Sequence, residues 1–119
     1  MMKRIIALLI TGVAAVAALS AQAGDADRGE VLYEVYCTQC HGMSGDGGGI
    51  NVRDMSVQPR DHTDPVEMGA RTDEELAKVI KHGGKAIDKS VLMPAWDDNL
   101  SDEQVGDLVT YLRQLCCEQ

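Results

Sequence analysis

Apolar residues recur at helical spacing in three segments of this chain, and no segment alternates with the two-residue period of a strand. The first segment covers residues 26–36, where Val31, Leu32, Val35 and Tyr36 fall on one stripe. This pattern predicts a helix that buries its stripe against the rest of the protein.

The other two segments begin with capping boxes, in which the side chains at the two ends of the first turn bond each other's backbone. Thr72 and Glu75 form the first box, and the helix that follows should stop at the glycine pair beginning at Gly83. Ser101 and Gln104 form the second box. The apolar positions that follow at helical spacing are Leu76, Val79 and Ile80 in one segment and Val105, Leu108, Val109, Leu112 and Leu115 in the other.

Two irregular stretches separate the predicted helices. Residues 42–64 are rich in glycine, aspartate and arginine, and residues 85–100 follow the second helix. A short turn or helix is expected from Pro65 to Gly69. The glycines of the first stretch would let its backbone run close to a bound group. Taken together, the pattern predicts an all-α domain of three main helices with irregular loops.

The segment Cys37-Thr38-Gln39-Cys40-His41 is the most specific chemical signal in the sequence, because CxxCH is the attachment motif of a c-type haem. Positions three and four apart share one face of a helical turn. The two thiols can therefore form thioethers with the vinyl groups of one porphyrin while the imidazole ligates its iron. The chain has no Phe, one Trp and three Tyr, so a buried porphyrin would also supply apolar bulk.

A CxxC pair also occurs in zinc sites and in dithiol redox centres. A structural zinc site needs about four protein ligands, and the other cysteines, Cys116 and Cys117, are adjacent near the C-terminus. A thioredoxin-like centre requires a βαβ context, and no strand-like run precedes Cys37. Haem is therefore the favoured interpretation.

Met93, just before Pro94 and the last predicted helix, is the favoured sixth ligand of the iron. A thioether is a soft, neutral donor, and a His/Met pair raises the reduction potential relative to two nitrogen ligands. Pro94 fixes φ and stiffens the backbone beside the ligand. Met43 is too close to His41 to reach the opposite face of the haem. The alternatives that stay open are His62, His82, Met55 and Met68.

The N-terminal segment has the layout of a secretory signal peptide. Lys3 and Arg4 precede an apolar run from Ile5 to Leu19, and the small residues of a cleavage site end at Ala23. The apolar run is shorter than the ~20 residues that span a bilayer as a helix. An uncleaved membrane anchor is the alternative, but we expect cleavage and no stable membrane insertion afterwards.

Cleavage after Ala23 would leave residues 24–119 as one monohaem domain exported to the periplasm. Loss of Lys3 and Arg4 leaves 9 basic residues against 19 acidic ones, a net charge near −10. Such a surface should repel nucleic acid and anionic membranes. It can also steer a redox donor or acceptor that has a basic docking surface.

On these residues the chain resembles a class I bacterial cytochrome c over nearly all of residues 24–119. The resemblance implies a small all-α fold wrapped around one covalently bound haem c, and a monohaem electron carrier like those of bacterial respiratory chains. It is consistent with Cys37 and Cys40 as the covalent attachment residues. It is also consistent with His41 and Met93 as the two iron ligands.

The resemblance carries further expectations about packing. In that family a glycine and an aromatic residue of the first helix pack on an aliphatic and an aromatic residue of the last. The matching residues here are Gly29 and Tyr33 on the first helix and Leu108 and Tyr111 on the last. The family also sets a proline carbonyl against the Nδ1–H of the proximal histidine, which implies Pro59 as the partner of His41. Trp96 resembles the aromatic residue that follows the ligand methionine and packs by the haem.

Three functions are compatible with these features. The first is a soluble periplasmic carrier of single electrons, which is not an enzyme because a fully ligated iron has no open position for a substrate. The second is a dedicated haem subunit of a larger oxidoreductase complex. The third is a ligand-binding or peroxidatic haem protein with an open sixth position, against which the presence of Met93 argues.

Cys116 and Cys117 depart from the family pattern. Adjacent cysteines rarely pair with each other because of the strain on the peptide between them. Unpaired thiols in an oxidising compartment suggest intermolecular bonds, so a disulfide-linked dimer is one expectation, and a frayed C-terminal tail without a function is the alternative.

Overall fold

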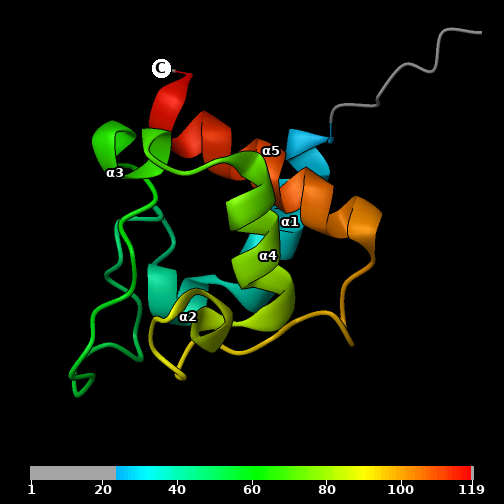
Figure 1. The fold of residues 1–119 in the computed structure, drawn as a ribbon. Coiled ribbons are helices and arrows are strands. Elements are labelled where there is room, and N and C mark those ends of the chain that lie inside the picture. Colours follow the sequence, from blue (N-terminus) through cyan, green and yellow to red (C-terminus); the bar gives the residue numbers. More distant parts are fainter. Residues whose placement is uncertain (1–23, 119) are drawn as a thin grey trace, which may run out of the picture.

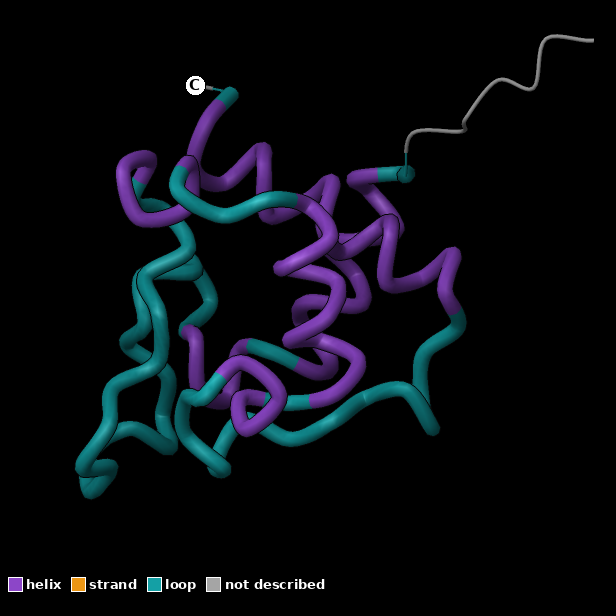
Figure 2. The backbone as a smooth tube through the Cα atoms, viewed as in Figure 1, coloured by secondary structure: helices purple, strands orange, loops and turns teal. Residues whose placement is uncertain are grey.

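The computed structural model describes residues 24–118, and Figure 1 shows their arrangement. The elements in chain order are α1 (Ala26–Tyr36), α2 (Thr38–His41), α3 (Pro65–Gly69), α4 (Asp73–His82), the 3-10 helix η1 (Gly84–Ile87) and α5 (Asp102–Cys117). No strand occurs within these residues, as Figure 2 shows by its colouring, so the expected all-α class is confirmed.

The expected signal peptide lies outside the residues that the structure describes. Within residues 24–118, no helix combines the length and the apolar character needed to cross a membrane.

The predicted helix boundaries agree closely with the structure. The α1 helix covers the expected range, and its N-cap Asp25 accepts a hydrogen bond from the backbone N–H of Arg28. Both capping boxes are present, the one of Thr72 at the start of α4 and the one of Ser101 at the start of α5. The α4 helix ends at the expected glycine, Gly83, whose φ of +78° is unfavourable for other residues.

The crossing of α1 and α5 organises the core (Figure 1). Gly29 lies at the crossing, where a Cβ atom would overlap the backbone carbonyl of Asp107 and come within 2.8 Å of the Tyr111 Cβ. Tyr33, one turn further along α1, is 1% exposed and its ring centroid lies 5.3 Å from that of Tyr111. Leu108 is also buried, so the pairing implied by the resemblance is confirmed.

The predicted apolar stripe of the first helix is confirmed for Leu32 and Tyr36, which pack against the core, and is wrong for the two valines. Val31 and Val35 are 61% and 64% exposed, whereas the buried residues of α1 are Gly29 and Tyr33. The reason is that the backbones of α1 and α5 approach closely at Gly29. The side of α1 that carries Gly29 and Tyr33 therefore faces α5. A count of apolar side chains cannot find this side, because the residue that allows the contact has no side chain.

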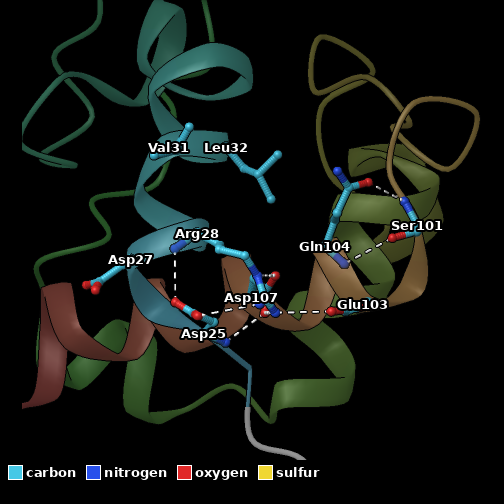
Figure 3. A pocket seen from close by; sticks show the side chains of 9 residues that line it. All are labelled: Asp25, Asp27, Arg28, Val31, Leu32, Ser101, Glu103, Gln104 and Asp107. Atoms are coloured by element: carbon cyan, nitrogen blue, oxygen red, sulfur yellow. Dashed lines mark hydrogen bonds and ion pairs between the residues drawn. The ribbon is translucent and has the colours of Figure 1, made fainter.

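An ion pair holds the N-terminal half of α1 to α5 (Figure 3). Asp107 is only 2% exposed, and its carboxylate accepts hydrogen bonds from Arg28 Nε at 2.9 Å and from the Asp25 backbone N–H at 2.7 Å. The hydrogen bond from Arg28 lowers the pKa of Asp107, so the carboxylate stays ionised. Figure 3 shows this pair in a surface groove that Val31 and Glu103 also line.

Arg113 connects α5 to the junction between α3 and α4. Its guanidinium donates to the backbone carbonyls of Met68 at 2.8 Å and Arg71 at 2.6 Å, and to the Asp73 carboxylate at 2.8 Å. The Met68 carbonyl also accepts the backbone N–H of Arg71 at 3.1 Å, and Arg71 lies between the end of α3 and the start of α4. One side chain of α5 therefore holds the start of α4 in place against α5. The buried hydrophobic residues of the core are Tyr33, Met68, Leu76, Ile80, Leu100, Val105, Leu108, Val109, Leu112 and Cys116.

The C-terminal cysteines differ from the expectation. The α5 helix runs through both of them, and Cys116 and Cys117 form a disulfide with each other. The prediction that adjacent cysteines would not pair is therefore wrong for this chain. Cys116 is 6% exposed and packs in the core. With both sulfurs in this bond, neither thiol is left for the predicted disulfide-linked dimer.

The close crossing predicts an asymmetric response of two glycines. Gly29→Ala should lower the free energy of unfolding by roughly 1–3 kcal/mol, because overpacking forces the two backbones apart. Gly106→Ala in α5 is the matched control, since its added Cβ meets nothing within 4 Å and should gain about 0.5–1 kcal/mol of helix propensity. Urea unfolding of the haem-loaded variants measures both changes. Equal effects at the two positions would contradict the crossing.

Candidate functional site

The CxxCH segment forms a helical turn that continues directly from α1. Cys37 ends α1 and precedes α2, and the N–H of His41 donates to the Cys37 carbonyl at 2.9 Å. The Thr38 hydroxyl is buried and donates to the Glu34 carbonyl at 2.8 Å, which secures the junction of the two helices. The predicted helical turn is thus present, with the two cysteines and the histidine at spacings of three and four.

The thiols of Cys37 and Cys40 are free and half-buried. Burial, with a smaller contribution from the neighbouring Cys40, raises the pKa of the Cys37 thiol to about 12. A dithiol redox centre has a lowered thiol pKa instead, so this environment argues against that alternative. Within residues 24–118, no group of three His, Cys, Asp or Glu side chains is placed to hold a metal ion.

His41 is oriented by a backbone carbonyl. Its Nδ1 lies 3.0 Å from the Arg60 carbonyl oxygen. A carbonyl only accepts, so Nδ1 carries the hydrogen and the lone pair of the neutral ring is on Nε2. Burial lowers the pKa of His41, which favours this neutral form. The residue therefore offers one nitrogen donor of fixed tautomer, as a haem iron requires of its proximal ligand.

The carbonyl expected from Pro59 is in fact that of Arg60. The Pro59 carbonyl faces Gly47, where a Cβ atom would lie only 2.9 Å from its oxygen. The next carbonyl along the chain, that of Arg60, accepts the hydrogen bond from His41 Nδ1. The prediction was one residue short because the glycine-rich loop sets which carbonyl faces inward.

The loop of residues 42–64 folds back along α2. The N–H groups of Gly47, Gly49 and Asn51 donate to the carbonyls of His41, Cys40 and Gln39 at 2.8, 3.1 and 2.9 Å. These carbonyls at the end of a short helix have no intrahelical donor. The loop thus provides a hydrogen-bond donor for each of these three carbonyls, and these bonds keep the CxxCH turn rigid. The φ of +83° at Gly47 makes this path specific to glycine at that position.

Met93 is half-buried in the loop that follows η1, and the end of α4 fixes its backbone. The Gly84 N–H donates to the Met93 carbonyl at 3.0 Å, and a Cβ on Gly83 would lie 2.7 Å from the same oxygen. The ring of Trp96 meets that of Tyr36 edge to face, with centroids 5.1 Å apart. Tyr36 immediately precedes Cys37, so this contact brings the Met93 loop beside the CxxCH segment.

The structure also places the other residues considered as ligands. His82 is exposed at the end of α4, and its Nδ1 lies 3.5 Å from the Asp97 carboxylate. Met68 is fully buried in the core, and Met55 is half-buried in the loop of residues 42–64. His62 lies against His41, with ring centroids 4.1 Å apart and an interplanar angle of 16°.

The contact of His62 with His41 is the feature that sequence reasoning missed. The Nδ1 of His62 lies 3.0 Å from the Tyr33 hydroxyl, which links the ring to α1. Burial of the ring, with contributions from His41 and Arg60, lowers the pKa of His62 well below its usual range. The histidine is therefore neutral. Its position depends on the path of a glycine-rich loop, for which the sequence offers no signal.

The site and fold together are those of a class I cytochrome c. The family described as cytochrome c oxidase, cbb3-type, subunit III matches residues 24–112. The chain is 26% identical to cytochrome c6 of Bryopsis maxima over 89 residues, which are 75% of this chain and 90% of that protein. This chain therefore belongs to the matched cytochrome c family and carries covalently bound haem c with its iron.

Two other similar proteins are much longer than this chain, and a third is of similar length. A quinohemoprotein alcohol dehydrogenase, ADH-IIG of Pseudomonas putida, is 30% identical over 95 residues, 80% of this chain but 11% of the enzyme. A structure of a Kuenenia stuttgartiensis reducing HAO-like protein complex matches with a TM-score of 0.64 and 28% identity, over 82% of this chain and 46% of that one. The KustC0563 c-type cytochrome matches in fold, with a TM-score of 0.59 and 24% identity, over 74% of this chain and 96% of that one.

The geometry of the CxxCH turn predicts how the haem is retained. Haem held through both Cys37 and Cys40 should stay with the unfolded chain in acidified organic solvent. Cys37→Ser and Cys40→Ser should each lower the yield of haem-loaded protein, because each removes one thioether. The variant in which Cys116 and Cys117 are both serine is the control and should keep its haem attached. Extraction of haem from the unsubstituted protein would contradict the covalent link.

Proposed function

We propose that the chain is an exported electron carrier that passes single electrons in the periplasm through one haem c. Cys37 and Cys40 form the thioethers, and His41 and Met93 are the axial ligands. The observation that carries the proposal is the hydrogen bond from His41 Nδ1 to the Arg60 carbonyl, which leaves Nε2 free as a donor. Such a bond fixes the ring and raises the basicity of the donor nitrogen.

The choice of Met93 rests on the position of its loop. The edge-to-face contact of Trp96 with Tyr36 ties that loop to the residue before Cys37. His82 instead faces Asp97 at the surface. His62 lies flat on His41, so it is on the same side of the haem as the proximal ligand. These contacts support Met93, in preference to His82 and His62, as the ligand on the other side.

When bound, the haem supplies a one-electron couple between ferric and ferrous iron. The chain holds both ligands on short, hydrogen-bonded segments, so little rearrangement accompanies the change in charge. A methionine ligand raises the potential relative to a second histidine. With both axial positions filled by the protein, no position is left for a substrate, and the chain acts as a carrier and not as an enzyme.

The proposed location and partner are based on the N-terminal segment and on the net charge of the chain. The basic and apolar N-terminal segment up to Ala23 is the basis for proposing export and cleavage there. The remaining residues carry a large negative charge. We therefore expect the redox donor or acceptor to present a basic docking surface, which would speed encounter at low salt.

A second function is favoured by the comparisons. Segments similar to this chain occur within a much longer alcohol dehydrogenase and within a longer chain of a reducing complex. A haem domain of this kind can thus be a fixed part of a larger oxidoreductase. The chain would then be a dedicated haem subunit with the same ligands, and co-purification with one partner would distinguish it from a diffusing carrier.

Substitution of the proposed sixth ligand provides the test. Met93→Ala should convert the low-spin six-coordinate iron to a high-spin or differently ligated form, and the reduction potential should fall because the thioether stabilises the reduced state. The oxidised unsubstituted protein should have the weak near-infrared band of a sulfur-to-iron transition, and Met93→Ala should lack it. Absorption spectra and a redox titration measure both effects.

Met55→Ala is the matched control, because Met55 is also half-buried in a loop. This variant should keep the near-infrared band and the potential of the unsubstituted protein. A band that persists in Met93→Ala, or that disappears in Met55→Ala, would assign the ligand elsewhere.

A further inference from the structure

His62 has no role in the proposed ligation, yet it is one of the most constrained side chains near the site. Its ring lies face to face with that of His41, with centroids 4.1 Å apart and an interplanar angle of 16°. At this distance and angle the two rings are in van der Waals contact over their faces. A ring in this position is beside the proximal ligand, where it limits how that ligand can move.

His62 is itself held from two directions. Its backbone N–H donates to the Gly45 carbonyl at 2.7 Å, which fixes the loop. Its Nδ1 lies 3.0 Å from the Tyr33 hydroxyl, and the two rings meet edge on with centroids 5.8 Å apart. Tyr33 is 1% exposed at the crossing of α1 and α5 and packs on Tyr111. The position of His62 is therefore set by the core of the protein.

We propose that His62 is a positioning residue for His41, whose anchored ring holds the proximal imidazole plane in one orientation. The proposal rests on the ligation by His41 proposed above. The hydrogen bond to the Arg60 carbonyl restrains His41 at one atom, and the terminal torsion of a histidine is broad. A ring stacked on the face removes the rocking motion that this single bond allows.

One short segment thus supplies both restraints. Arg60 provides the carbonyl that accepts the hydrogen bond from His41 Nδ1, and His62 provides the stacked ring two residues later. The orientation of an axial imidazole determines how its orbitals overlap those of the iron. The ring of His62 also covers one face of His41 against water. Groups outside the immediate ligands tune a metal centre through orientation and solvent access in this way.

The test uses haem-loaded variants that separate the ring from its anchor. His62→Ala removes the stacked ring, His62→Phe keeps an aromatic ring in its place, and Tyr33→Phe keeps the packing but removes the hydroxyl anchor. His82→Ala is the control, because His82 is an exposed histidine paired with Asp97. The readouts are the hyperfine-shifted haem methyl signals in the NMR spectrum of the oxidised protein and the reduction potential. Covalent haem content and thermal unfolding are measured alongside.

His62→Ala should change the pattern of haem methyl shifts, which reports the orientation of the axial imidazole, while haem content stays normal. Its reduction potential should fall, because water on the proximal side favours the more highly charged oxidised iron. His62→Phe should restore both properties toward the unsubstituted values. Tyr33→Phe should shift the methyl pattern in the same direction as His62→Ala, by less. His82→Ala should change neither.

Two results would overturn the proposal. One is a methyl pattern and potential in His62→Ala equal to those of the unsubstituted protein. The other is an equal displacement in His62→Ala and His62→Phe, since a stacked ring would then have no effect. Both leave the proposed function intact as long as the unsubstituted protein has the low-spin spectrum of His/Met ligation. Absence of that spectrum in the unsubstituted protein would mean that the proposed function had failed, independently of His62.

Discussion

The hydrogen bond from His41 Nδ1 to the Arg60 carbonyl is the interaction on which the organisation of the site depends. It determines the tautomer of the ring and therefore which nitrogen can act as a donor. It also fixes the far end of the loop of residues 42–64 against the CxxCH turn. The near end is fixed by the hydrogen bonds from Gly47 and Gly49 to the carbonyls of His41 and Cys40. The loop is thus closed at both ends on the turn that it supports.

This closed loop is connected to the core by Tyr33. Gly29 allows α1 and α5 to approach closely, and this crossing buries Tyr33 one turn later. The Tyr33 hydroxyl then reaches His62, two residues beyond Arg60. A contact at the crossing of two helices is therefore linked, through one hydrogen bond and one stacked ring, to the proposed proximal ligand. The stability of the crossing and the order of the site are parts of one arrangement.

Much of the fold could be predicted from the sequence, because its signals are local. The capping boxes at Thr72 and Ser101 specify helix starts through hydrogen bonds within one turn, and both occur as expected. The motif of the two cysteines and a histidine is equally local. The resemblance to the family predicted that Gly29 packs against the last helix. The apolar pattern of the first helix indicated a different side of that helix. That pattern favoured Val31 and Val35, which are exposed.

The errors and omissions arise where the outcome depends on contacts between distant segments. The carbonyl that faces His41 belongs to Arg60, whereas that of Pro59 lies against Gly47, and no pattern in the loop indicates this. The stacking of His62 on His41 depends on the same loop path. The pairing of Cys116 with Cys117 was missed because the general geometric argument against adjacent cysteines was applied without knowledge of the local backbone.

The central claim is that the Arg60 carbonyl orients His41, and NMR of the reduced, haem-loaded protein tests it most directly. In protein labelled with ¹⁵N and ¹³C, the Nδ1–H proton of His41 should exchange slowly with water. Its nitrogen should couple through the hydrogen bond to the carbonyl carbon of Arg60. An Nδ1–H that exchanges freely with solvent, or a coupling to the carbonyl carbon of Pro59, would contradict the account.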